Sequence, residues 1–174
     1  FIGGGTPTSL EDDLFEDLLK FISPLLENNG EFSIESTPES LSINKIKLMA
    51  KYGINRVSIG VESTNDKILK AINRNHEFSD VVSAVNLLKE NGITNINADL
   101  ILGLPNSSLS LLEKDIESIL SLDLTHVSCY GLTVHEHTVF FNKKIEAPLD
   151  DELRAFYDLV NQKLIENSFI HYEI

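Results

Sequence analysis

Short strand-like segments alternate with amphipathic helices along almost the whole of this 174-residue chain. In the strand-like segments apolar residues alternate with small or polar ones, and in the helices apolar residues recur at helical spacing. The predicted strands are Phe1–Ile2, 32–36, 56–62, 96–102, 127–134 and 169–174. The predicted helices are 10–26 (ending at Asn28-Asn29-Gly30), 43–52, 66–72, 78–90, 109–120 and 151–167. Such alternation is typical of parallel strands joined by helical crossovers, so we expect an α/β fold, a partial (β/α) barrel with outer helices.

The composition narrows the function classes. Lys and Arg number 14 against 27 Asp and Glu, and the net charge of -13 argues against a nucleic-acid partner. Cys129 is the only cysteine, which excludes an internal disulfide and a complete cysteine-based zinc or iron–sulfur site. No apolar run approaches the length of a membrane span, and no signal peptide opens the chain. These features predict a cytoplasmic protein without an integral membrane segment.

Both ends of the chain lie inside predicted strands. The first residue is Phe1 rather than Met, and it already belongs to an apolar strand pattern. The last residues, 169–174, have the pattern of another strand. We therefore expect residues 1–174 to be one piece of a larger domain, truncated at both ends.

A glycine-rich turn, Gly3-Gly4-Gly5-Thr6-Pro7-Thr8, follows the first predicted strand. Ligands of open α/β sheets gather beyond the carboxyl ends of the strands, and bare glycine backbone there allows close approach of a ligand amine, carboxylate or ribose. The turn is not a dinucleotide fingerprint, because Thr8 stands where the third glycine belongs, and it lacks the Gly-Lys-Ser/Thr of a phosphate loop. Two interpretations follow: a ligand contact, or only a tight strand-to-helix turn.

Three carboxylates lie at strand positions where a charge is costly unless it is engaged. Glu35 and Glu62 stand late in their strands at the polar phase, where they could accept hydrogen bonds from ribose hydroxyls or an amino group. The alternative is a structural ion pair with Arg56 or Arg74. Asp99 stands in an otherwise apolar strand, for which a ligand or arginine contact is favoured.

His135 and His137 suggest a metal site, because alternate residues of an extended segment point the same way. No third ligand is specified, so solvated or locally hydrogen-bonded histidines are the favoured interpretation. Cys129 is interpreted as a buried strand residue. No metal ligand in this chain and no catalytic residue is assigned.

Four strand-end motifs occur in one order: Gly-Gly-Gly-Thr-Pro-Thr at 3–8, Ile-Glu-Ser-Thr-Pro at 34–38, Asn-Arg-Val-Ser-Ile-Gly-Val-Glu-Ser at 55–63, and Asn-Ala-Asp-Leu-Ile-Leu-Gly-Leu-Pro at 97–105. Together they resemble the radical S-adenosylmethionine (radical SAM) family of oxygen-independent coproporphyrinogen III oxidases and their heme-chaperone relatives. The segments 128–133 and 171–174 are more similar to the heme-chaperone branch.

The resemblance implies a radical SAM core domain of which residues 1–174 are the central part. Its first strand, with a Cys-x-x-x-Cys-x-x-Cys loop holding a [4Fe-4S] cluster, and its C-terminal region would lie outside this chain. The positions that match the family's SAM-binding residues are Gly4, Gly5, Thr6, Glu35, Glu62, Arg74, Asp99 and Gly131. Glu62 departs from the family, which usually has glutamine there, and this puts a second SAM site in doubt. The segment 135–138 replaces the usual Glu-Pro-Gly-Thr turn.

The function that the resemblance implies is that of a heme chaperone, which binds heme and a [4Fe-4S] cluster and transfers heme to an acceptor protein. The alternative is a coproporphyrinogen oxidase that oxidatively decarboxylates propionates in porphyrin biosynthesis. A third hypothesis is a degenerate barrel that never held a cluster. The residues able to ligate heme by their chemistry are His76, His126, His135, His137 and Cys129. The 174 residues alone are predicted to be inactive in radical chemistry, because one cysteine cannot supply three thiolates.

Overall fold

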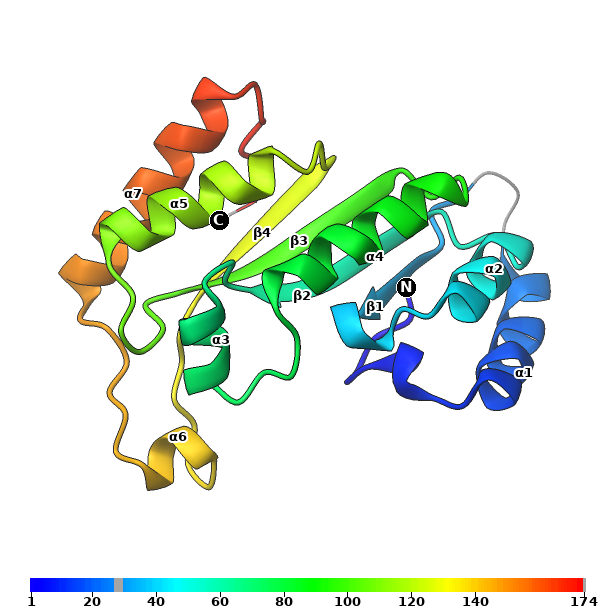
Figure 1. The fold of residues 1–174 in the computed structure, drawn as a ribbon, viewed down its shortest axis with the longest axis horizontal. Coiled ribbons are helices and arrows are strands. Elements are labelled where there is room, and N and C mark those ends of the chain that lie inside the picture. Colours follow the sequence, from blue (N-terminus) through cyan, green and yellow to red (C-terminus); the bar gives the residue numbers. More distant parts are fainter. Residues whose placement is uncertain (27–29, 174) are drawn as a thin grey trace. The chain divides into compact units, whose positions relative to one another are not determined.

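The computed structural model describes residues 1–26 and 30–173. Four parallel strands form one sheet in the order β1-β2-β3-β4 (Figure 1). They are β1 (Ser33–Ser36), β2 (Arg56–Glu62), β3 (Asn95–Leu102) and β4 (His126–Gly131). In the β1–β2 pair, Glu35 lies opposite Ser58. The predicted α/β class with parallel strands is confirmed.

Helices follow the strands in turn. They are α1 (Asp12–Ile22), α2 (Ile43–Lys51), α3 (Asp66–Ala71), α4 (Phe78–Glu90), α5 (Leu109–Leu120), α6 (Val139–Asn142) and α7 (Asp150–Glu166). Side chains cap four of them: Ser42 accepts from Lys45 N before α2, and Asn65, Ser108 and Thr138 cap α3, α5 and α6 in the same way. Across residues 1–26 and 30–173, no helix combines the length and apolarity that crossing a membrane requires.

The chain divides into two compact units. The first comprises Phe1–Val61, Phe78–Asp99 and Leu124–Val127, and the second comprises Glu62–Glu77, Leu100–Asp123 and Ser128–Ile174. The dividing points fall inside β2, β3 and β4. The first unit therefore holds β1 with α1, α2 and α4, and the second holds α3, α5, α6 and α7.

The core of the first unit combines strand and helix side chains. Ile34 of β1 and Val57 of β2 are fully buried, as are Phe15 and Leu19 on one face of α1. The helix α1 packs against α2, which in turn contacts α4. Each such side chain contributes roughly 1.5–3 kcal/mol by leaving water, so Phe15 and Leu19 fix α1 in place, whereas Leu14 of the same helix is exposed.

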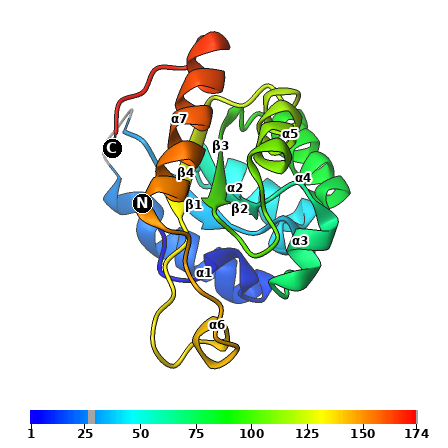
Figure 2. The same ribbon diagram turned by 90° about the vertical axis from the view of Figure 1, so that its left-hand side faces the viewer.

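The core of the second unit forms where α5 packs against α7. Its buried residues are Leu102, Leu112, Ile116, Phe156 and Val160. Figures 1 and 2 show α6 at the tip of an extended segment, away from α5 and α7 of the same unit. Within that segment, 134–149, α6 is the one helix among the described residues.

The sequence-based boundaries were wrong at three strands. Residues 169–173 form no strand, and Ile170 is 84% exposed, because no neighbouring strand covers it or pairs with it among the described residues. Phe1–Ile2 contributes only an isolated parallel bridge from Ile2 to Ile34. The strand expected over 127–134 is His126–Gly131. Asn28 and Asn29, where the first helix was expected to end, lie outside the described residues, and α1 itself ends at Ile22.

Candidate functional site

The glycine turn is held by a carboxylate from β1. The backbone N–H of Gly4 donates to Oε2 of Glu35 at 3.1 Å. Gly4 and Gly5 have φ of 90° and 108°, a region that glycine adopts readily and other residues avoid. A Cβ built on either of them would meet no heavy atom within 4 Å. The turn therefore presents bare backbone to open space, as close approach by a ligand requires.

The rest of the turn is fixed by its own hydrogen bonds. The carbonyl of Thr6 accepts from Ser9 N at 2.9 Å and from Ser9 Oγ at 2.7 Å. The fully buried Thr8 shares a 2.5 Å hydrogen bond with the hydroxyl of Ser40, which lies just beyond β1. These bonds anchor the turn at its far end, while Glu35 holds it at Gly4.

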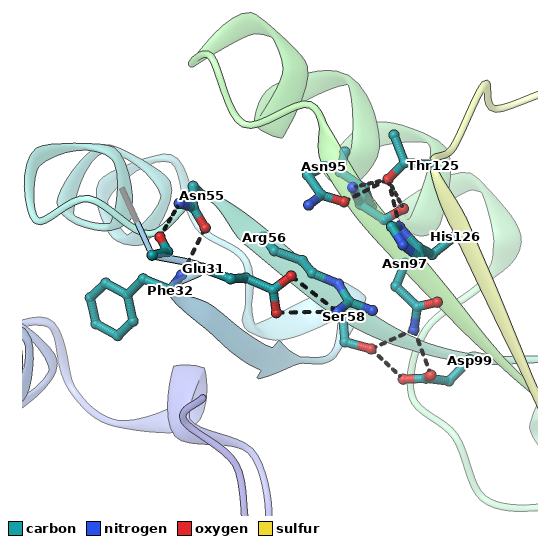
Figure 3. Close-up of polar contacts among 12 residues, drawn as sticks. Glu31, Phe32, Asn55, Arg56, Ser58, Asn95, Asn97, Asp99, Thr125 and His126 are labelled. Carbon is teal, nitrogen blue, oxygen red and sulfur yellow. Dashed lines mark hydrogen bonds and ion pairs between the residues drawn. The ribbon is translucent and has the colours of Figure 1, made fainter. Parts of the chain in front are cut away.

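A ring of hydrogen bonds joins β2 to β3 (Figure 3). Ser58 Oγ donates to Asp99 Oδ2 at 2.7 Å. Asn97 Nδ2 donates to Ser58 Oγ at 2.7 Å and to Asp99 Oδ1 at 2.8 Å. Sequence reasoning singled out Asp99 but missed Ser58 and Asn97. The available signal was that Asn97 stands two residues before Asp99 in a strand, and so on the same face.

Glu35, Ser58 and Asp99 form one polar row across three strands of the first unit. Glu35 is the register partner of Ser58, and paired residues of neighbouring strands project from the same face of a sheet. Ser58 is in turn bonded to Asp99. The row has a carboxylate at each end, Glu35 beside the open turn at Gly4 and Asp99 on β3, which suits a ligand rich in hydroxyl or amino donors.

Glu62 forms an ion pair with Arg74 in the second unit. The side chain of Glu62 is 9% exposed and that of Arg74 is 35% exposed. The pairing is one of the two interpretations that the sequence allowed. The other arginine considered, Arg56, lies 3.2 Å from Glu31 instead, because the register places it opposite Ser33 at the start of β1 (Figure 3).

The segment that follows Glu62 is fixed by Asp115 of α5. Asp115 accepts hydrogen bonds from Ser63 Oγ at 2.8 Å, Thr64 N at 3.0 Å and Thr64 Oγ1 at 2.6 Å. Burial raises the pKa of the Asp115 carboxyl, while the hydrogen bonds from Thr64 and Ser63 act in the opposite direction. Asp115 was not singled out from the sequence, although it stands between Leu112 and Ile119 on the apolar stripe.

Gly131 ends β4 and has a packing role. A Cβ at Gly131 would lie 2.8 Å from Leu153 of α7, and its N–H donates to the Tyr157 hydroxyl at 2.9 Å. Close packing of the strand end on α7 therefore explains the glycine without a ligand. The SAM contact that the family resemblance implies at Gly131 stays a prediction.

The side chains able to ligate heme do not gather into a metal site. His76 is buried, whereas His135 and His137 are exposed. His126 Nδ1 lies 3.1 Å from Thr125 Oγ1, and burial, aided by the Arg56 charge, lowers its pKa. Among residues 1–26 and 30–173, no three His, Cys, Asp or Glu side chains are grouped as metal ligands.

Cys129 was interpreted as buried, but it is only partly so. It lies on β4 and packs against the apolar core of the second unit.

Comparisons with known proteins agree with one another. The family described as "Radical SAM superfamily" matches residues 1–119. The whole chain is 37% identical to the heme chaperones HemW of Bacillus subtilis and of Lactococcus lactis, of which it covers 48% each. The solved structure of coproporphyrinogen III oxidase (HemN) from Escherichia coli, a radical SAM enzyme, superposes with a TM-score of 0.81 at 26% identity, over 97% of this chain and 40% of that one. The chain thus spans about half the length of the curated relatives it matches.

Proposed function

The chain belongs to the radical SAM superfamily, and on that premise we propose that it is the central part of the SAM-binding core domain of a cytoplasmic heme chaperone. The similarity to HemW proteins over the full length of the chain supports the chaperone assignment. One structural observation supports the SAM site most directly. It is the open Gly4–Gly5 turn held by Glu35, with Asp99 on the same polar row.

The residues of the first unit fit SAM chemically. SAM carries an amino group, a carboxylate and two ribose hydroxyls. The bare backbone at Gly4 and Gly5 allows close approach of the methionine moiety, and Glu35 and Asp99 offer acceptors for amino or hydroxyl donors. In this proposal these residues bind and orient SAM, and Thr6 completes the turn.

Glu62, Arg74 and Gly131 belong to the second unit. The Glu62–Arg74 pair neutralises the guanidinium that an anionic group of a second ligand would use. We propose that this pair weakens any second SAM site, in keeping with the replacement of the family's glutamine by Glu62.

The residues of this chain do not fit a [4Fe-4S] cluster. Such a cluster takes cysteine thiolates, and the sequence contains a single cysteine. We propose that the cluster ligands of the protein lie outside these 174 residues. Iron at cluster stoichiometry on the isolated 174 residues would contradict this assignment.

Heme transfer is tested by titrating heme into the full-length protein. A stoichiometric heme absorption band, followed by loss of heme to an acceptor apoprotein, is the expected result. Absence of a saturable band, with or without SAM, overturns the chaperone proposal.

A second function is favoured by the similarity to HemN. It is oxidative decarboxylation of the propionates of coproporphyrinogen III. The distinguishing measurement is anaerobic product analysis with coproporphyrinogen III, SAM and reductant. Protoporphyrinogen and carbon dioxide would favour the oxidase, whereas heme uptake without turnover favours the chaperone.

A further inference from the structure

The ring formed by Ser58, Asn97 and Asp99 has a fixed direction of hydrogen bonding (Figure 3). The Asn97 amide donates both of its protons, one to Ser58 Oγ and one to Asp99 Oδ1. The Ser58 hydroxyl accepts the first of these hydrogen bonds and donates one of its own to Asp99 Oδ2. Two of the three hydrogen bonds are therefore donated to Asp99, and the third is donated to the Ser58 hydroxyl that itself donates to Asp99.

Asn97 is more deeply buried than the other two members of the ring. Asn97 is 2% exposed, so its amide is fixed by its surroundings, whereas Asp99 and Ser58 are only partly buried. Each oxygen of the Asp99 carboxylate accepts one hydrogen bond of the ring. With both oxygens held, the carboxylate plane cannot rotate freely about the Cβ–Cγ bond.

We propose that Ser58 and Asn97 are positioning residues, which orient the Asp99 carboxylate so that it accepts hydrogen bonds from the ribose hydroxyls of the bound nucleoside. This inference rests on the proposed function, because it takes SAM as the ligand. Ser58 and Asn97 do not contact the ligand and act only through Asp99. A carboxylate held in one orientation binds a hydroxyl without first losing rotational freedom, so the ring increases affinity by preorganisation.

The test compares SAM with its 2′-deoxy and 3′-deoxy analogues on the full-length protein carrying its cluster, by equilibrium dialysis. Ser58→Ala removes two of the three ring bonds, the one that Ser58 donates to Asp99 and the one that it accepts from Asn97. We expect SAM affinity to fall about tenfold, the size expected for a hydrogen bond to a charged group. For the analogue that lacks the hydroxyl bound by Asp99, the same substitution is expected to change affinity by less than about twofold. Without that hydroxyl there is no hydrogen bond to Asp99 that a fixed carboxylate orientation could strengthen.

Two variants separate positioning from structure. Ser58→Thr keeps the hydroxyl and suits a strand, so it is expected to restore most of the affinity. Ser83→Ala is the matched control, since Ser83 lies exposed on α4 of the same unit and bonds only its own helix at Ser79 O in the contacts described, and it should leave affinity unchanged.

A second substitution tests Asn97. Asn97→Asp removes both amide donors and places another carboxyl beside Asp99, so the expected loss of SAM affinity exceeds that of Ser58→Ala. Urea unfolding of each variant establishes that it is folded, and if Asn97→Asp does not fold, Ser58→Ala decides.

The outcomes are distinct. Failure of the unsubstituted protein to bind SAM overturns the proposed function and this inference with it. SAM binding that Ser58→Ala leaves unchanged, or that it weakens equally for SAM and both deoxy analogues, overturns the positioning role while the proposed function stands.

Discussion

Thr64 and Asp115, 51 residues apart in the sequence, are joined by a 2.6 Å hydrogen bond from the threonine hydroxyl to Oδ1 of the carboxylate. A second bond, from Thr64 N at 3.0 Å, reaches the same oxygen. Asp115 is 7% exposed, so this carboxylate fixes the β2–α3 connection from a largely buried position on α5. The segment it fixes begins directly after Glu62.

Asp115 gives the stability of the protein a distinctive pH dependence. Because burial raises its pKa above the unfolded value, the folded state binds the proton more tightly, and the contribution of this group to the free energy of unfolding falls as pH rises through the folded pKa. Asp115→Asn has no such titration. We therefore expect the stability of the variant, relative to the unsubstituted protein, to be higher at pH 7 than at pH 4, as measured by urea unfolding. A difference that is the same at both pH values would contradict the prediction.

Glu16 is expected to change stability with pH in the opposite direction to Asp115. The hydrogen bond from Lys51, then that from Tyr52, lower the pKa of Glu16 to about 2. Its contribution to stability is therefore present above the unfolded pKa near 4.5 and is lost as pH falls toward 2. Glu16→Gln should lower stability at pH 7 and have little effect at pH 2. The effect at pH 7 should shrink in 1 M salt, because the pair is exposed to solvent.

Breaking the Glu62–Arg74 pair should destabilise the protein more than breaking a surface pair. Glu62→Gln removes the charge that neutralises Arg74, and we expect a loss of about 1–2 kcal/mol, below the range for fully buried pairs because Arg74 is partly exposed. The matched control is Glu113→Gln, whose partner Lys163 lies on α7 and for which the expected loss is smaller. Equal losses in urea unfolding would show that burial of Glu62 adds nothing.

The open turn predicts a separation of binding from stability. Gly4→Ala and Gly53→Ala each place a methyl at positive φ with no heavy atom within 4 Å, so each should cost about 1 kcal/mol of stability from backbone strain. Only the methyl at Gly4 stands where the proposed ligand approaches. We expect SAM affinity to fall at least tenfold for Gly4→Ala and to stay unchanged for Gly53→Ala. Equal affinity of the two variants would place the ligand elsewhere.

The parts of the fold that are set by local pattern were predictable from the sequence. Apolar residues at helical spacing predicted helices over 10–26 and 43–52, where α1 and α2 form. The strand predicted over 169–174 is absent from residues 169–173. An apolar alternating pattern forms a strand only beside another strand, and no described strand covers Ile170.

The polar contacts depended on register, which the sequence did not specify. Arg56 pairs with Glu31 rather than with Glu35 or Glu62, because its strand partner is Ser33. Asn97 and Ser58 needed the pairing of β2 with β3 before their ring with Asp99 could be recognised. Individual carboxylates could therefore be singled out from the sequence, but not the partners that hold them.

Glu62 has a φ of 66°, in the left-handed region that β-branched residues avoid. This backbone limits which amino acids position 62 tolerates, independently of the ion pair with Arg74. In a saturation library sorted only for folded protein, Gly and Asn should be recovered at position 62 more often than Val and Ile, because they adopt this conformation at lower cost. The same library sorted for ligand binding would reveal which of the residues tolerated at position 62 also preserve binding.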